Sequence, residues 1–242
     1  GATRARGASE GGGSSGGLGV ERVLHSLTVV GDPKGGAPAI GIVEKGLAAL
    51  ESLLFAKYQM YRNVYWHHAV RSATAMYKRL VDDALRSGAI EEAELAGFTD
   101  EGLLHRLEER APSALLDGLR NRRLHKRAFE CSSTELQDGE GDWIANDRDR
   151  VIAAENALTR ELGVEPGAVL LDYPEKPRML GLDLPVRMRD GKVRRLGASG
   201  WPAAINLPLL SQELYESTRV MRVFATEGVR VPRERVMELL VT

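Results

Sequence analysis

The longest periodic pattern in the chain is helical. Between about residues 43 and 87, apolar and aromatic side chains recur at steps of three and four residues, and no proline interrupts them. This spacing predicts an amphipathic helix. At about 1.5 Å per residue such a helix would span on the order of 60 Å, which is long for a globular domain. We therefore expect a bend or break near His67 and His68.

The rest of the chain alternates between short helices and short strands. Further helices are expected from Thr99 to about Arg110, from Ser113 to about Asn121, from Asn146 or Asp147 to Gly163, over residues 207–216, and after Pro232. Strands are expected within residues 18–30 (after a short helix) and at 122–130, 168–171, 184–188, 192–196 and 218–225. The pair Asp190-Gly191 is typical of a two-residue type I′ hairpin turn. Helices come first and strands later, so the pattern predicts an α+β fold, mainly α-helical with a small antiparallel β-sheet.

Composition narrows the class of protein. The chain has 242 residues, of which 43% are hydrophobic and 28% charged, as is usual for a soluble globular protein. It contains no apolar run of about 20 residues and no signal-peptide pattern, so we expect a cytoplasmic protein without a membrane partner. The single cysteine, Cys131, excludes an intramolecular disulfide and a cysteine-based zinc site. With a net charge of −1, no specific nucleic-acid partner is expected.

The first seventeen residues are rich in glycine and serine. Such a segment buries too little apolar surface to offset the entropy of ordering it, so we interpret it as a flexible tail or linker; an expression scar is the alternative. Together with the patterns above, this divides the chain into a tail (residues 1–17), a helical region (18–130) and an α+β subdomain (131–242).

The long helix carries the first chemical candidates. Lys57, Tyr61 and Tyr65 are four residues apart and share a helical face, where a lysine can hold phosphate and aromatic rings can cover a sugar or base. Core packing produces the same spacing, with Lys57 as an ordinary surface residue. His67 and His68 are adjacent and point about 100° apart, so they cannot both ligate one metal ion. The chain contains no Walker A loop, GxSxG or HExxH motif.

Residues 120–127 form a densely basic run. If the run is extended, Arg122 and Lys126 share one face with Leu124, whereas Arg123 and Arg127 share the other. The run can bind phosphate, or its charge can protect an edge strand from pairing with another chain.

Several spaced motifs resemble one enzyme family. Residues 55–85 (FAKYQMYRNVYWHHAVRSATAMYKRLVDDAL) resemble the helix that follows the HD domain in bacterial HD-superfamily phosphohydrolases and, more distantly, in the sterile-alpha-motif/HD-domain deoxynucleotide triphosphohydrolases of animals. The likeness continues, in the same order, in GVERVLHSLTVV, FTDEGLLHRLEERAP, RNRRLHKRAFE, VLLDYPEKP, LPVRMRDGKVRRL and ESTRVMRVFAT. It therefore covers roughly residues 18–240 and implies a mainly α-helical HD-associated region followed by an α+β C-terminal subdomain.

The resemblance also implies substrate contacts. Lys57 stands at a family position that binds the triphosphate of the substrate. Tyr61 and Tyr65 stand where side chains line the substrate, and Tyr65 would pack on the deoxyribose so that a 2′-hydroxyl is disfavoured. Trp66 falls near the base.

Contacts to an activating nucleotide are implied as well, at Asn63, His67, His68, Arg122 and Lys126. Two of these positions depart from the family pattern. His68 stands where the family usually has lysine, and Asn63 stands where it often has a basic residue.

Family catalysis depends on a His…His-Asp…Asp set that holds a divalent metal, Mg²⁺ or Mn²⁺. No His-Asp dipeptide occurs in these 242 residues, so we expect no catalytic residue and no metal in this chain, and no hydrolysis by it alone. We interpret it as the substrate- and effector-contacting C-terminal part of a dNTP triphosphohydrolase. Its expected partners are deoxynucleoside triphosphates or GTP, a separate HD lobe, and further copies of itself in a homo-oligomer. The alternative is a non-enzymatic nucleotide-binding or oligomerisation module on the same scaffold.

Overall fold

The computed structural model describes residues 19–31, 35, 37–175, 183–196 and 207–241, so the expected tail (residues 1–17) lies outside the described part. The α-helices are α1 (Val20–Leu24), α2 (Leu47–Met60), α3 (His68–Arg86), α4 (Glu92–Leu95), α5 (Asp100–Arg110), α6 (Ala114–Arg120), α7 (Trp143–Asn146), α8 (Arg148–Leu162), α9 (Leu207–Thr218) and α10 (Arg233–Val241). The other helical segments are the 3₁₀ turns η1 (Glu44–Gly46) and η3 (Ser133–Glu135) and the π-helix η2 (Tyr61–Tyr65).

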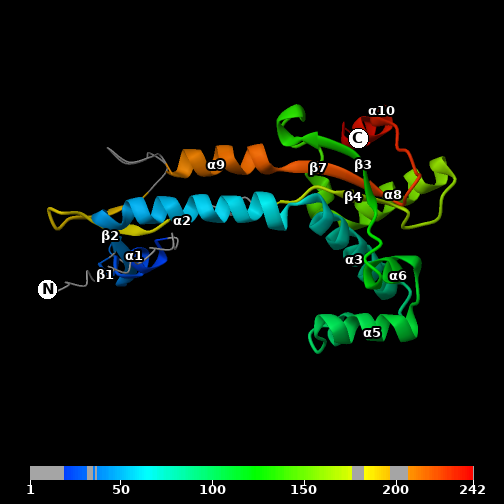
Figure 1. Cartoon of the computed structure of the whole chain (residues 1–242), viewed down its shortest axis with the longest axis horizontal. Helices are drawn as coiled ribbons and strands as arrows, with labels where there is room; N and C mark the ends of the chain where they lie inside the picture. Colours follow the sequence, from blue (N-terminus) through cyan, green and yellow to red (C-terminus); the bar gives the residue numbers. More distant parts are fainter. Residues whose placement is uncertain (1–18, 32–34, 36, 176–182, 197–206, 242) are drawn as a thin grey trace, which may run out of the picture. The chain divides into compact units, whose positions relative to one another are not determined.

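Strands are fewer than helices. They are β1 (Leu27–Val30), β2 (Ala39–Val43), β3 (Lys126–Ser132), β4 (Val169–Asp172), β5 (Pro185–Arg187), β6 (Val193–Arg195) and β7 (Val220–Ala225) (Figure 1). They form two small sheets, with strand orders β1-β2-β5-β6 and β3-β7-β4. The expected α+β class is confirmed, and the first sheet is mixed because β2 and β5 run parallel. None of the described helices is long and apolar enough to cross a membrane.

Two compact units divide the chain, one of residues 1–57 and 182–208 and the other of residues 58–181 and 209–242. The sequence suggests other boundaries, at residues 17 and 130, from its composition and hydrophobic pattern. That division stays a prediction. In the first unit, the four-stranded sheet buries its core against the start of α2. That core consists of Ile42, Leu47, Leu50, Val186 and Leu196.

The β5–β6 hairpin of the first unit is confirmed, but its turn is not type I′. Gly191 has a φ of 82°, whereas Asp190 has no positive φ, and a type I′ turn requires positive φ at both central residues. The Asp190 carboxylate accepts a hydrogen bond from the Lys192 amide at 2.9 Å, and the Met188 amide donates to the Lys192 carbonyl at 2.8 Å. This local side-chain bond favours a longer loop in which glycine alone is left-handed.

The second unit is built in three layers around the sheet β3-β7-β4, whose strands are all antiparallel (Figure 1). Successive side chains of a strand point to opposite faces. Val223 therefore packs with α8 and α10 on one face, whereas Phe224 and Leu170 pack with α3, α5 and α6 on the other. Basic residues 122–125 precede β3, which begins at Lys126 and lies at an edge of the sheet.

A buried ion pair joins the layers of this unit. Arg79 of α3 donates from Nη1 to Glu155 of α8 at 2.8 Å, and both side chains are almost fully buried. The other carboxylate oxygen of Glu155 accepts from the Leu171 amide of β4 at 3.0 Å. The pair therefore links two helices to the strand between them.

The expected break of the long helix is confirmed. Residues 61–65 form one turn of π-helix, in which the Trp66 amide donates to the Tyr61 carbonyl at 2.8 Å. His67 then has an extended backbone (φ −61°, ψ 137°) and caps α3. The inserted residue of a π-turn shifts the register of the helix, a feature that recurs at functional sites.

The helix boundaries follow the expected capping residues. Thr99, Ser113 and Asp147 each accept a backbone amide at the start of α5, α6 and α8, and Gly163 ends α8 with a φ of 66°. These expected boundaries are confirmed.

Candidate functional site

A polar cavity of about 280 Å³ lies where the end of the π-helix meets β3 and β7. We call it the histidine cavity. Its walls are Arg62, Asn63, Trp66, His67, His68, Arg127, Ser217, Thr218, Val220 and Arg222. The π-turn and the break after it place His67 and His68 side by side at the start of α3, with ring centroids 4.2 Å apart. All of these residues belong to the second unit.

Arg222 is the most buried charge of the histidine cavity, with 8% of its side chain exposed. It lies on the same face of β7 as Phe224, and this face is the one covered by α3. Its Nε donates to Glu130 at 2.9 Å, while its Nη1 is buried without a hydrogen-bond partner among the described residues. A buried guanidinium N–H without a hydrogen-bond partner lowers the stability of the fold, so we expect this donor to be satisfied by an acceptor that binds in the cavity.

Glu130 holds the two arginines of the sheet together. It accepts hydrogen bonds from Arg127 at 2.9 Å and from Arg222 at 2.9 Å. Burial would raise the pKa of Glu130, but these two hydrogen bonds outweigh it and leave the pKa below its ordinary value. The carboxylate is therefore ionised at neutral pH and orients both guanidinium groups beside the cavity.

The aromatic residues of this region form a cluster of their own. Tyr58 and Trp66 are buried, and Trp66 packs edge-on against Tyr61 and Tyr215 with centroids 5.9 Å and 5.8 Å away. Tyr65 lies 5.1 Å from Tyr61 and is half exposed. The predicted substrate residues Tyr61, Tyr65 and Trp66 thus lie together, with Trp66 serving as core on one side.

Lys57, the fourth predicted substrate residue, is exposed in the last turn of α2, in the first compact unit. Its proposed contact to a triphosphate stays a prediction.

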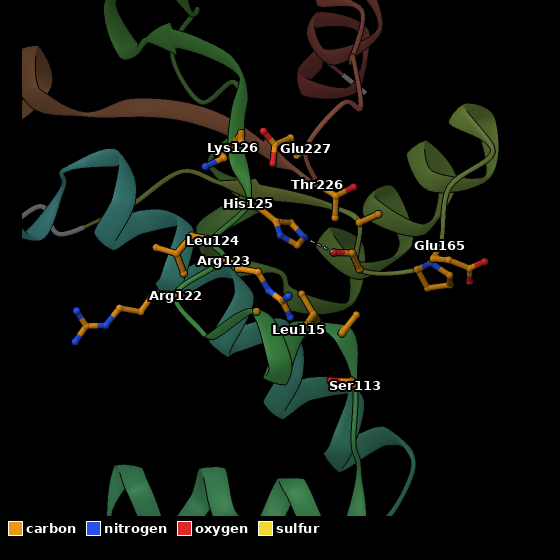
Figure 2. Close-up of a pocket in the computed structure, with 15 residues that line it drawn as sticks. Ser113, Leu115, Arg122, Arg123, Leu124, His125, Lys126, Glu165, Thr226 and Glu227 are labelled. Carbon is orange, nitrogen blue, oxygen red and sulfur yellow. Dashed lines mark hydrogen bonds between the residues drawn. The ribbon is translucent and has the colours of Figure 1, made fainter. Parts of the chain in front are cut away.

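A second, larger cleft of about 490 Å³ lies beside the basic run. We call it the strand cleft, and Figure 2 shows its lining residues. The side chains of Arg123 and His125 point into it, whereas those of Arg122 and Lys126 project from the other side of the chain (Figure 2). The run is not extended throughout, because Arg122 has a positive φ and β3 begins only at Lys126, so the roles of the two faces stay a prediction.

Three cations border the strand cleft without a carboxylate partner in the described structure: Arg122, Arg123 and Lys126. The neighbouring arginines do have carboxylate partners: Arg120 forms an ion pair with Glu101, and Arg127 forms one with Glu130. The cleft is lined by these three cations together with two carboxylates, Glu165 and Glu227, so its positive charge is partly offset.

Arg122 also has an unusual backbone. Its φ of 54° is the only positive value at a non-glycine position in the described residues. It follows the end of α6, where the Arg123 amide donates to the Gly118 carbonyl at 2.8 Å, an arrangement that favours glycine at the left-handed position. Backbone strain of this kind costs roughly 1–2 kcal/mol and is more frequent at functional sites.

His125 closes the inner wall of the strand cleft. Its Nε2 lies 2.8 Å from the Gly167 carbonyl, so this nitrogen carries the proton and donates. Burial lowers the pKa of His125, against the opposing effect of this hydrogen bond, and the ring is neutral at neutral pH.

The structure thus separates the five predicted effector residues into two places. Asn63, His67 and His68 line the histidine cavity, whereas Arg122 and Lys126 border the strand cleft. Sequence reasoning missed Arg222, Arg127, Ser217 and Thr218 as cavity residues. For Arg222 a signal existed, because it is the one charge within the buried strand VMRVFA.

No group of three or more His, Cys, Asp or Glu side chains in the described part of the chain is arranged to hold a metal ion.

Comparison with known proteins relates this chain to HD-associated regions. A family model described as the HD-associated region matches residues 19–201. An uncharacterized protein of Methanocaldococcus jannaschii, MJ1154, is 29% identical over 219 residues, which cover 90% of this chain and 45% of that protein. The chain therefore spans about half the length of this curated relative.

Two solved structures share the fold. A phosphohydrolase of Bacteroides thetaiotaomicron (BT4208) superimposes with a TM-score of 0.56 at 18% identity, covering 88% of this chain and 57% of its own. A hypothetical protein of Aquifex aeolicus gives a TM-score of 0.52 at 17% identity, covering 95% of this chain and 53% of its own. Because the family match extends over residues 19–201, the chain belongs to the family of HD-associated regions.

Proposed function

We propose that this chain is the nucleotide-contacting C-terminal part of an HD-superfamily deoxynucleoside triphosphate triphosphohydrolase, and that the histidine cavity binds nucleotide phosphates. In this proposal the ligand is a deoxynucleoside triphosphate or GTP, and the HD metal site is supplied from outside these 242 residues. The observation that carries it is the buried guanidinium group of Arg222, a residue that lines the cavity and whose Nη1 has no hydrogen-bond partner among the described residues.

The surroundings of Arg222 support phosphate as the ligand. Arg62 and Arg127 add two cations to the walls, and Asn63, Ser217 and Thr218 add neutral polar groups. Guanidinium groups match phosphate oxygens in geometry as well as charge. The cavity of about 280 Å³ has room for a phosphate chain but is small for a whole nucleotide, so the sugar and base would extend out of it.

The experiment is a calorimetric titration of the protein with inorganic tripolyphosphate and with dATP. Arg222→Gln removes the positive charge and the paired N–H donors of the guanidinium group. Glu130 keeps a partner in this variant, because Arg127 still donates to it. Charge-assisted contacts contribute roughly 1.5–3 kcal/mol, so affinity should fall about ten- to a hundredfold. The control is Arg230→Gln, since Arg230 lies outside both cavity linings. Equal affinity of wild type and Arg222→Gln, with both folded by circular dichroism, would contradict the proposal.

A second function is a nucleotide-binding or oligomerisation module without hydrolysis. The observation in its favour is the lack of a His-Asp dipeptide in these 242 residues. Both functions predict nucleotide binding, and they differ in turnover. Release of tripolyphosphate from dATP after addition of an HD-containing partner chain would favour the first, and binding without release would favour the second.

A further inference from the structure

The two rings of the histidine cavity have different hydrogen-bonding roles. His67 caps α3, and its Nδ1 accepts a hydrogen bond from the Ala69 amide at 3.4 Å. The neutral ring of His67 therefore carries its proton on Nε2, and protonating Nδ1 would end the cap. His68 stacks on it and has no hydrogen bond of its own ring in the described structure. His68 is the ring that can gain a proton without losing a backbone contact.

The groups facing His68 come from three directions. His67 precedes it, Arg127 and Glu130 come from β3, and Arg222 comes from β7. Burial lowers the pKa of His68 from its ordinary 6.5, and electrostatic interactions with His67, Arg127 and Arg222 lower it further, while Glu130 acts in the opposite direction. In the free protein His68 is therefore neutral at neutral pH.

An oxyanion in the cavity reverses this balance. Its negative charge would lie among the same groups that disfavour protonation of His68, and it would offset the charges of Arg127 and Arg222. A bound anion thus raises the pKa of His68, because an opposite charge nearby favours the charged form of a titrating group.

We propose that the histidine cavity binds phosphate-type oxyanions together with a proton, which His68 takes up. This inference rests on the proposed function of the cavity and adds that its occupancy is regulated by pH. The pKa of His68 is higher in the bound than in the free state, so affinity rises as pH falls between the two values. A shift of one pKa unit corresponds to a factor of about ten in affinity.

Sulfate is the probe for this linkage, because it remains a dianion over the whole range and any pH dependence then comes from the protein. Its dissociation constant is measured at about pH 8 and about pH 5, a range that includes the ordinary histidine pKa and extends below it, where the free His68 ring titrates. The imidazole resonances of His68 are followed by NMR with and without saturating sulfate. The variants are His68→Gln and, as a matched control, His105→Gln, since His105 is an exposed histidine on α5 beside Glu109.

Wild type and His105→Gln should bind sulfate about tenfold more tightly at the lower pH, and the His68 pKa should rise in its presence. His68→Gln should bind with little pH dependence while keeping the wild-type circular dichroism. An unchanged His68 pKa at saturation, or the same pH slope in His68→Gln, would overturn the inference. If one of these results is found and Arg222→Gln nevertheless abolishes sulfate binding, the inference about the proton is wrong but the proposal that the cavity binds phosphate is kept. Failure of the wild type to bind sulfate or tripolyphosphate at either pH would overturn both.

Discussion

Replacing Arg122 by glycine should make the protein more stable and, at the same time, a poorer phosphate binder. Arg122 has a φ of 54° after the end of α6, a conformation that costs an L-residue roughly 1–2 kcal/mol and glycine almost nothing. Glycine loses more freedom on folding, which offsets about 0.5–1 kcal/mol of that gain. The net expectation is a stabilisation of about 0.5–1 kcal/mol, or a rise in Tm of roughly 1–4 °C for a chain of this size.

The matched variant is Arg123→Gly, one residue later and without a positive φ. It has no strain to relieve, so urea unfolding should show a loss of about 0.5–1 kcal/mol. If the basic run holds phosphate separately from the histidine cavity, as the resemblance implies, Arg122→Gly should weaken tripolyphosphate binding there by about one to two decades, and Arg123→Gly should leave it nearly unchanged. Lower stability of Arg122→Gly would refute the strain argument. Equal small losses of affinity in both variants, vanishing at high salt, would refute the assignment of Arg122.

Three more predictions concern the core, the buried histidine and the chemistry. Glu155→Leu removes the acceptor of Nη1 of Arg79 and of the Leu171 amide, while Asp83 and Asn156 still bind the rest of the Arg79 guanidinium group. Each buried donor left unsatisfied costs about 1–3 kcal/mol, so urea unfolding should show a loss of about 2–4 kcal/mol; a loss below about 1 kcal/mol would argue against the pair, since that much is expected for an exposed ion pair. Because the pKa of His125 is lowered from 6.5, its contribution to stability is present above pH 6.5 and is lost as pH falls through the folded-state value, at no more than about 1.4 kcal/mol per pH unit. A pH series of melting temperatures should show this loss and its reduction in His125→Gln, and identical curves would count against it. The chain by itself should release no tripolyphosphate from any deoxynucleotide with Mg²⁺ or Mn²⁺, and release that disappears in Lys57→Ala would show the expectation to be wrong.

Local signals carried most of the fold prediction. The capping residues Thr99 and Ser113 and the left-handed Gly163 fix helix ends through contacts within a few residues, so the sequence shows them directly. The turn at Asp190 was predicted wrongly, because a single hydrogen bond from the Lys192 amide to its side chain decides the loop type.

The candidate site could be predicted only in part. His67 and His68 were visible as neighbours at the break of a long helix, and the family resemblance gave them a role. Arg222 was not visible as their partner, because it reaches the cavity through the pairing of β7 with β3, far apart in the sequence. Strand pairing over such distances depends on tertiary packing, which no local pattern encodes.

The central claim is that the histidine cavity is a phosphate site, and a crystal structure of the protein grown with saturating tripolyphosphate tests it most directly. The account predicts electron density for a phosphate group within hydrogen-bond distance of Nη1 of Arg222, with Nε2 of His67 directed toward the same oxygens. Tripolyphosphate bound elsewhere, with Nη1 of Arg222 satisfied by a protein group instead, would contradict it.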